Sequence, residues 1–349
     1  MLKAEFKKYQ LQFKRPAGTS RGVYKVRDCW FIRVWNTENP DVFGWGECAP
    51  LPDLSCDALP NYETILSEVC TDINRYEYWI KDGLVEWPSI RFGLETAILD
   101  LNGGGKRILF DMDFAEGRQT LTINGLIWMG DVAFMKEQIA LKLQQGFRCV
   151  KMKIGAIDWE NELAILKEIR KSYSADILEL RVDANGAFAV NEVQDVLKQL
   201  SELDIHSIEQ PIKQGQWKEM AALCASSPVG IALDEELIGV HDWHEKNELL
   251  DTIKPQYIIL KPSLHGGLKG SGEWIKLAEE RNIDWWITSA LESNIGLNAI
   301  AQYTALFDSR MPQGLGTGQL FVNNFESPLT LDGDQLRYDT TKEWTIDLD

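Results

Sequence analysis

Residues 149–155 read CVKMKIG, and this short stretch decides how the rest of the chain is interpreted. Apolar residues alternate with Lys151 and Lys153, and Gly155 ends the run, so the pattern predicts a β-strand. Side chains two positions apart on a strand point to the same side, so both ammonium groups share one face. The function of the stretch depends on whether that face meets water or the interior of the protein.

The stretch is one of about eight similar units between residues 119 and 318. Each unit is a short apolar-rich strand, a turn and a helix-like segment, with roughly 20–30 residues from strand to strand, as β-α units require. Strands are predicted at 120–129, 149–155, 178–185, 206–212, 229–237, 257–265, 284–291 and 313–318. Amphipathic segments such as 158–174, 190–203 and 268–281 are predicted helices. The pattern favours an α/β fold, a (β/α)7β-type TIM-like barrel, over an open doubly wound sheet.

The two ends of the chain differ from this repeat. Antiparallel strands are predicted at 2–15 and 30–36, around a turn-rich segment, and helices at 61–78 and 89–102. The tail beyond Phe321 is short and again strand-like. We predict three parts: residues 1–118 form an α+β domain, residues 119–318 form the barrel, and residues 319–349 return to the first domain.

Composition narrows the classes of function. The 349 residues are 44% hydrophobic and 26% charged, which is typical of a soluble globular protein. A net charge of −17 disfavours binding to nucleic acid or to anionic membranes. No apolar run is long enough to span a bilayer, no signal region opens the chain, and the six cysteines form no Cys-x-x-Cys pair. These features predict a cytoplasmic protein with reduced thiols, and they indicate no particular oligomeric state.

Charged residues recur on one face of the predicted barrel strands. The positions are Lys151, Lys153, Asp183, Glu209, Asp234 and Lys261. Each lies near the C-terminal end of its strand and alternates with apolar residues that must face the surrounding helices. The six charges are therefore expected to point inward at the end of the barrel where catalytic residues lie in this fold.

A purely structural network of ion pairs is the alternative interpretation of these charges. Burying six charges costs several kcal/mol each unless they are paired, and apolar residues would fill a barrel more cheaply. Three carboxylates from adjacent strands, without nearby His or Cys, form a hard oxygen site that suits Mg²⁺ better than zinc. Lysines beside such a metal are expected to have a lowered pKa, which suits a general base.

In these motifs the sequence resembles the enolase superfamily and, within it, the o-succinylbenzoate synthases of menaquinone biosynthesis. The matching motifs are Lys151-Met152-Lys153, Asp183 in VDANG, Glu209 in IEQPI, Asp234 in LDEEL and Lys261 in LKPSLHGG. Residues 44–55 (GWGECAPLPDLS) resemble the family's capping-domain loop, which closes over the substrate. Residues 288–302 resemble its seventh strand and the helix that follows.

The resemblance implies a lyase that carries out the syn-dehydration of 2-succinyl-6-hydroxy-2,4-cyclohexadiene-1-carboxylate to o-succinylbenzoate. Lys153 would remove the proton α to the carboxylate and then protonate the leaving hydroxide. Lys261 would stay charged on the opposite face, and Lys151 would tune Lys153. The implied cofactor is Mg²⁺, with Mn²⁺ as a substitute, and its implied ligands are Asp183, Glu209 and Asp234. The implied partner is a small-molecule carboxylate.

Four further residues are candidate contacts to the substrate or to the site: Arg181, Asn185, Ser289 and Arg21. Arg181 and Asn185 share the inward face of their strand, although barrel packing and pairing with Glu179 explain them equally well. Ser289, with the backbone amides of GLGTG (314–318), is placed to receive a substrate carboxylate. Arg21 lies in a turn from which the capping domain would reach the substrate.

A second activity fits the same lysines. Racemisation of N-acylamino acids, such as N-succinylamino acids, needs one base on each face of the substrate, and Lys153 and Lys261 would supply both. Dipeptide epimerases of the superfamily carry an Asp-x-Asp on the eighth strand, whereas this chain has GLGTG there, which argues against that activity. A catalytically silent barrel would be expected to have lost a ligand or a lysine, and none is missing.

Overall fold

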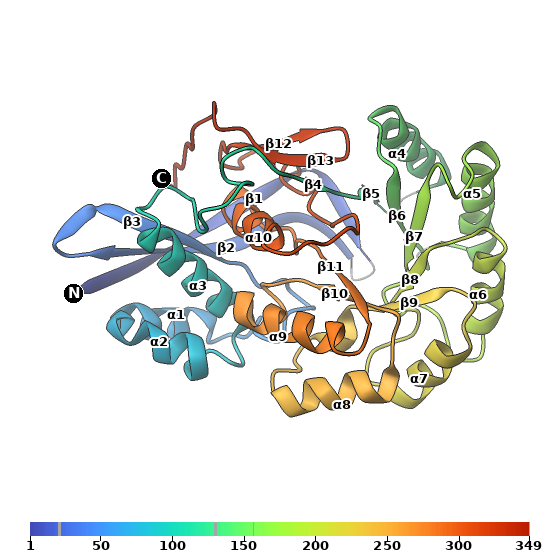
Figure 1. The fold of residues 1–349 in the computed structure, drawn as a ribbon, viewed down its shortest axis with the longest axis horizontal. Coiled ribbons are helices and arrows are strands. Elements are labelled where there is room, and N and C mark those ends of the chain that lie inside the picture. Colours follow the sequence, from blue (N-terminus) through green and yellow to red (C-terminus); the bar gives the residue numbers. More distant parts are fainter. Residues whose placement is uncertain (20–21, 129–130, 156, 349) are drawn as a thin grey trace.

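The computed structural model describes residues 1–19, 22–128, 131–155 and 157–348. The described residues form three sheets: an antiparallel sheet of order β1-β2-β3, a parallel sheet running from β5 to β11, and a small antiparallel sheet of order β12-β13-β4. Figure 1 shows the long N-terminal strands and the helices beside them on one side of the molecule, with the parallel sheet and its helices on the other.

The N-terminal sheet consists of β1 (Leu2–Thr19), β2 (Gly22–Asn36) and β3 (Asn39–Cys48). The β1–β2 pairing continues past the predicted strand end, with a register shift between Gln12 and Ala17, so the turn-rich segment extends the hairpin. Two helices pack on this sheet, α1 (Tyr62–Thr71) and α3 (Pro88–Asn102). The short helical segments Ile73–Arg75, Tyr76–Tyr78 (α2) and Trp79–Gly83 connect them.

Glycines bring α3 directly onto β3. A Cβ atom at Gly46 would lie 1.8 Å from the carbonyl oxygen of Gly93, and a Cβ atom at Gly93 would lie 2.2 Å from Sγ of Cys48. A Cβ atom at Gly44 would lie 1.9 Å from the carbonyl oxygen of Ala97. The helix and the strand therefore meet backbone to backbone, and no larger residue fits at these positions.

Seven parallel strands form the curled sheet predicted from the repeat, and each pairs with the next strand in the sequence. The strands are β5 (Gly125–Ile127), β6 (Cys149–Lys153), β7 (Glu179–Asp183), β8 (Ser207–Glu209), β9 (Gly230–Leu233), β10 (Tyr257–Leu260) and β11 (Asp284–Ile287). The helices are α4 (Val132–Gln144), α5 (Trp159–Ser172), α6 (Val193–Ser201), α7 (Trp217–Ser226), α8 (Trp243–Ile253), α9 (Gly267–Glu279) and α10 (Asn294–Thr304). This strand order confirms the barrel class and excludes the doubly wound alternative.

The predicted eighth strand, 313–318, is reduced to two bridging residues. Gln313 bridges to Ile123, and Gly314 bridges to Thr288 just after β11, so the ring closes through single contacts. The predicted first strand, 120–129, breaks into β4 (Thr120–Thr122) and β5. The break arises because β4 pairs with the C-terminal tail rather than with the barrel.

The C-terminal tail contacts both parts of the molecule. Its strands β12 (Leu329–Asp332) and β13 (Gln335–Tyr338) form the small sheet with β4. Beyond them, Trp344 and Ile346 pack in a cluster with residues of the N-terminal sheet. The boundaries at residues 118 and 318 stay predictions. None of the helices that the structure describes combines the length and apolar character needed to cross a bilayer.

Side chains alternate across the barrel wall as the period-2 rule predicts. On β7, Leu180 and Val182 are buried in the large core between the sheet and its helices. Arg181 points the other way, and its guanidinium lies 4.3 Å from the ring of Trp286 inside the barrel. Asp183 shares this inward face one layer further along the strand. The charged face of the strands, which on β6 carries Lys151 and Lys153, therefore points to the interior of the protein and not to water.

We expect Gly46→Ala to lower the free energy of unfolding by about 3 kcal/mol or more, because the new methyl group meets backbone that cannot move aside. Urea denaturation measures the change. The matched control is Gly316→Ala, where a Cβ atom would have its nearest neighbour at 3.5 Å. Equal stability of the two variants would contradict the close packing of α3 on β3.

Candidate active site

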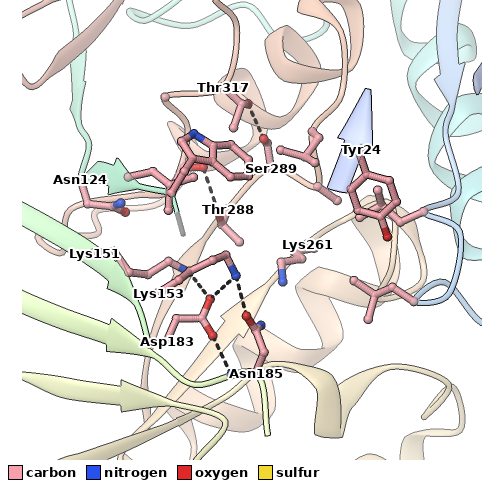
Figure 2. A pocket seen from close by; sticks show the side chains of 18 of the residues that line it. Tyr24, Asn124, Lys151, Lys153, Asp183, Asn185, Lys261, Thr288, Ser289 and Thr317 are labelled. Carbon is pink, nitrogen blue, oxygen red and sulfur yellow. Dashed lines mark hydrogen bonds and ion pairs between the residues drawn. The ribbon is translucent and has the colours of Figure 1, made fainter. Parts of the chain in front are cut away.

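A pocket lies at the C-terminal ends of the parallel strands, where the barrel faces the N-terminal sheet (Figure 2). It encloses about 860 Å³, part of which is open to solvent. Leu51 and Leu54, from the loop that the sequence analysis identified as a cap, line one side. The polar residues of the barrel that line it are Asn124, Lys151, Lys153, Asp183, Asn185, Glu235, Lys261, Thr288, Ser289 and Thr317.

The two lysines of β6 face this pocket and contact carboxylates of the neighbouring strands. Nζ of Lys153 lies 2.9 Å from Oδ2 of Asp183 and donates to Oδ1 of Asn185 at 2.7 Å. Nζ of Lys151 lies 2.5 Å from Oε2 of Glu209 and 3.3 Å from Oδ2 of Asp183. Because β6, β7 and β8 are in parallel register, Lys153, Asp183 and Glu209 stand side by side at one level of the barrel.

Lys261 approaches the pocket from the other side. It follows β10 directly and forms an ion pair with Asp234, which follows β9 and is fully buried. Figure 2 shows its ammonium group across the cavity from the Lys151–Lys153 pair. The backbone N–H of Lys261 donates a hydrogen bond to Nδ1 of His265 at 2.9 Å. Two ammonium groups thus face one another across the space that a substrate would occupy.

The carboxylates and lysines shift one another's pKa values in opposite directions. Burial raises the pKa of Glu209 to about 8, and the charge of Asp183 adds to the rise while Lys151 opposes it. Burial also acts to raise the pKa of Asp183, but Lys153 and Lys151 outweigh it and hold that pKa well below its usual range. The pKa values of the two buried acids are thus shifted in opposite directions, because two lysines act on Asp183 whereas burial dominates at Glu209.

Carboxylate contacts raise the pKa of two of the lysines, whereas the lowered pKa expected beside a bound metal stays a prediction. Burial alone would lower the pKa of Lys151, but Glu209 and Asp183 outweigh it and raise the value. The same balance, with Asp234 as the main partner, raises the pKa of Lys261. The prediction assumed that a metal would neutralise the carboxylates, whereas here the lysines contact those carboxylates themselves.

The three carboxylates have the chemistry of a hard divalent-cation site. Oε1 of Glu209 and Oδ1 of Asp234 are buried and have no hydrogen-bond partner among the described residues. Such orphaned oxygens are costly unless something else binds them. As the side chains stand, no three acidic, His or Cys groups of the described residues converge closely enough to hold an ion, because the lysines contact the other oxygens. The donor atoms therefore fit a cation, provided the side chains turn towards it.

Two residues next to the carboxylates adopt a left-handed backbone that non-glycine residues rarely use. Asn185 has φ 45° and Gln210 has φ 40°. The Asn185 amide joins Lys153 to Glu235, to which it donates at 2.9 Å. The Gln210 amide donates to Oε2 of Glu236 at 3.0 Å. Such strain persists only where surrounding contacts over-determine it, which is typical of functional sites.

The alternation expected after β9 does not continue. The predicted strand 229–237 implies that Glu236, two residues after Asp234, shares its inward face. Instead, β9 ends at Leu233 and a 3₁₀ turn, Glu235–Leu237, follows. The turn brings Glu235 to the pocket instead. Glu236 accepts a hydrogen bond from the backbone N–H of Gly215 at 2.7 Å, so it supports a neighbouring loop.

Of the other candidate residues, some line the pocket and some do not. Asn185 and Ser289 line the pocket, and the Ser289 hydroxyl shares a hydrogen bond with Thr317. Arg181 does not line it: its guanidinium donates to Glu179 at 2.7 Å and to the carbonyl oxygen of Pro312 at 2.9 Å inside the barrel. Arg21 lies outside the described residues.

Several pocket residues were missed by the sequence analysis. Asn124, Leu126 and Trp128 all line the pocket from the first barrel segment. They are spaced two apart, so applying the period-2 rule to that segment would have found them. Tyr24 of β2 also lines the pocket, and its position depends on how the two halves of the molecule pack, for which the sequence carries no local signal.

Comparison with known proteins places this arrangement in a family. Residues 135–339 match the family described as enolase C-terminal domain-like, and residues 1–101 match the family described as MenC, N-terminal domain. The chain belongs to the enolase superfamily. The carboxylates and lysines at the ends of β6 to β10 all lie within the matched C-terminal region.

Individual members of the enolase superfamily show how specific the match is. The chain is 47% identical to an o-succinylbenzoate synthase from Desulfotalea psychrophila, over 95% of this chain and 98% of the relative. The crystal structure of MenC from that organism superposes with a TM-score of 0.86, at 44% identity, over 96% of this chain and 99% of the other. A Bacillus subtilis L-Ala-D/L-Glu epimerase is 23% identical over 87% of this chain and 85% of its own. Membership of the superfamily and of its o-succinylbenzoate synthase family, predicted from the motifs, is confirmed.

Proposed function

We propose that the protein is an o-succinylbenzoate synthase, a dehydratase that converts 2-succinyl-6-hydroxy-2,4-cyclohexadiene-1-carboxylate to o-succinylbenzoate in menaquinone biosynthesis. The observation that carries the proposal is the pair of ammonium groups, Lys153 and Lys261, facing one pocket in a chain 47% identical to a synthase of that name. The ammonium groups that line the pocket support a small-molecule carboxylate as the partner, and the six free cysteines support the cytoplasm as the location.

Lys153 is placed to move both protons of the dehydration. It would take the proton α to the substrate carboxylate as that C–H bond breaks. It would then return this proton to the hydroxyl group that leaves from the same face, so water departs and the ring becomes aromatic. Asp183 and Asn185 hold the amine by two hydrogen bonds, which limits its motion between the two steps. One base suffices because both bonds break on one face.

Lys261 and Lys151 would act through their charge. Lys261 lies across the pocket, paired with Asp234, and stays protonated where negative charge develops on the substrate. Its ammonium group also suits a cation–π contact with the aromatising ring. Lys151 lies behind Lys153, paired with Glu209, and would tune Lys153 through its charge.

We propose that Asp183, Glu209 and Asp234 hold a divalent cation, with Mg²⁺ as the natural ion and Mn²⁺ as a substitute. The cation, when bound, would stabilise negative charge on the substrate carboxylate. The orphaned oxygens of Glu209 and Asp234 support this assignment, because a cation would satisfy both.

The metal assignment predicts that Glu209→Gln weakens Mn²⁺ binding at least about tenfold, because a charged oxygen ligand is lost. Calorimetric titration of the folded protein with Mn²⁺ measures it. The matched control is Glu179→Gln, four residues before Asp183 on β7, where the carboxylate pairs with Arg181 instead. Chelation should abolish turnover, and Mg²⁺ or Mn²⁺ should restore it. Full activity in exhaustively chelated protein would rule out the site.

The assignment of Lys153 as the base predicts that Lys153→Ala lowers kcat by about 10²–10⁴-fold. The control is Lys136→Ala on α4, where the ammonium group forms an exposed ion pair with Glu168 and lines no part of the pocket. Steady-state kinetics on the cyclohexadiene substrate separates the two variants. If Lys153→Ala keeps more than about a tenth of the wild-type kcat, another residue is the base.

Racemisation of N-succinylamino acids is the second candidate, because Lys153 and Lys261 face the pocket from two sides. It makes a stricter demand on geometry, since both lysines must exchange protons with a flexible acyl chain. The region after the last barrel helix adds no carboxylate: Gly314, Gly316 and Thr317 line the pocket there. Dehydration needs only Lys153 to move protons, and we therefore propose it as the principal activity.

We expect kcat/KM for the cyclohexadiene substrate to exceed that for N-succinylamino acids of either hand. Dehydration is followed by absorbance as the ring becomes aromatic, and racemisation by inversion together with α-deuterium uptake in heavy water. Deuterium uptake without inversion would show only that one base reaches the α-carbon. Inversion with a kcat/KM equal to or above that of dehydration would make racemisation the principal activity.

A further inference from the structure

One wall of the pocket is a short segment held in an unfavourable conformation. Thr288, Ser289, Ala290 and Leu291 line the pocket between β11 and α10. Leu291 has φ 66°, in the left-handed region that branched apolar residues avoid. Contacts from elsewhere must hold the segment in place, because strain of this kind relaxes when its surroundings permit.

Arg27 of β2 supplies one of these contacts and a second contact to the capping loop. Its side chain is buried, with 3% of the residue exposed. Nη1 donates a hydrogen bond to the carbonyl oxygen of Ala290, and Nη2 donates one to the carbonyl oxygen of Ala49 at 2.5 Å. Ala49 lies in the capping loop, whose Leu51 and Leu54 line the pocket and pack in one cluster with Ala290 and Leu291. One guanidinium group therefore ties together two pocket walls that lie far apart in the sequence.

Glu47 of β3 holds the helix that follows the strained segment. Its carboxylate is 1% exposed and accepts hydrogen bonds from the backbone N–H and the hydroxyl of Ser293, at 2.9 and 2.5 Å, and from the N–H of Gly296 at 2.9 Å. Helix starts leave such N–H groups without partners, so this carboxylate caps α10 from another part of the chain. Figure 1 shows α10 lying beside the N-terminal sheet, as this contact requires.

Glu292 links the same wall to the segment that carries Lys261. It is fully buried, and it accepts a hydrogen bond from the N–H of Ala290 at 2.7 Å and one from the hydroxyl of Ser263 at 2.5 Å. Ser263 lies two residues after Lys261. A displacement of Ala290 would therefore be transmitted to the lysine across the pocket from Lys153.

We propose that Arg27 is a positioning residue: it sets the separation between the capping loop and the 288–291 wall, with Glu47 holding α10 against the same wall. Apolar residues would fill this space at lower cost than three buried charges, so packing alone does not account for them. Arginine is required because its planar fork presents two donors in fixed geometry, whereas lysine offers a single nitrogen. The inference rests on the proposed function, since the pocket it shapes is the proposed substrate site.

The test compares Arg27→Lys and Arg27→Gln with the matched variants Arg107→Lys and Arg107→Gln. Arg107 is also a buried arginine, paired with Asp100 at 2.7 Å, and its carbonyl oxygen contacts α10 through Asn298, but it lines no part of the pocket. Melting temperature, kcat and KM for dehydration, and binding of o-succinylbenzoate by calorimetry are measured for each. Hydrogen–deuterium exchange of residues 50–58 and 288–296 reports on the two walls.

We expect both Arg27 variants to raise KM and weaken product binding by roughly ten- to a hundredfold, because hydrogen bonds from a charged group are lost. Arg27→Lys should lose less than Arg27→Gln, and exchange should rise in both walls together. The Arg107 variants should lower the melting temperature with KM and exchange of the walls unchanged.

The outcomes separate the inference from the function on which it rests. Absence of dehydration by wild-type protein would overturn the proposed function. Product binding and hydrogen–deuterium exchange would still test whether Arg27 positions the two pocket walls. A folded Arg27→Gln protein with wild-type KM, product binding and exchange would overturn the inference. If Arg27→Gln does not fold, the same measurements on Arg27→Lys decide, and wild-type values there would overturn it equally.

Discussion

Charge neutralisation inside the barrel is the constraint on which the rest of this structure depends. Buried charges are tolerated only when each has a partner, and here three lysines and three carboxylates supply one another. The pairing requires strands in parallel register, so that Lys153, Asp183 and Glu209 stand at one level. It also leaves one oxygen each of Glu209 and Asp234 without a hydrogen-bond partner among the described residues. Buried oxygens of this kind are expected to bind a further group.

The N-terminal part of the chain completes the barrel as well as covering it. Glu47 caps α10, and Glu95 of α3 caps α9 by accepting a hydrogen bond from the N–H of Leu268 at 2.5 Å. Burial raises the pKa of Glu95 to about 7, so this cap carries a real desolvation cost. Both carboxylates reach helices that follow the strands next to the pocket, β10 and β11. The two parts of the chain therefore share polar contacts that an isolated barrel would lack.

The sequence predicts well those features that depend on local periodicity. Alternation along a strand is local, so it identified Lys153 and Asp183 as inward residues and Leu180 as an outward one. It failed where long-range contacts decide: the predicted strand at 120–129 breaks in two, because β4 pairs with the tail, and the predicted strand at 313–318 shrinks to two bridges. It also failed at Glu236, where a 3₁₀ turn ends the alternation. Tyr24 and Arg27 reach the site only through the packing of the N-terminal sheet, which no local pattern encodes.

Strained backbone near the pocket, like the buried charges, is stabilised by polar contacts. Asn185, Gln210 and Leu291 all have positive φ, and each lies at or beside the pocket. Each is held by polar contacts of its own side chain or of its neighbours. Lys153 donates a hydrogen bond to Asn185, Arg27 donates one to the carbonyl oxygen of Ala290, and the N–H of Ala290 donates one to Glu292. A site built this way is preorganised, because contacts within the folded protein, rather than substrate binding, hold the strained backbone in place. Polar groups that are costly to bury one at a time thus fix the positions of the pocket lysines in the folded protein.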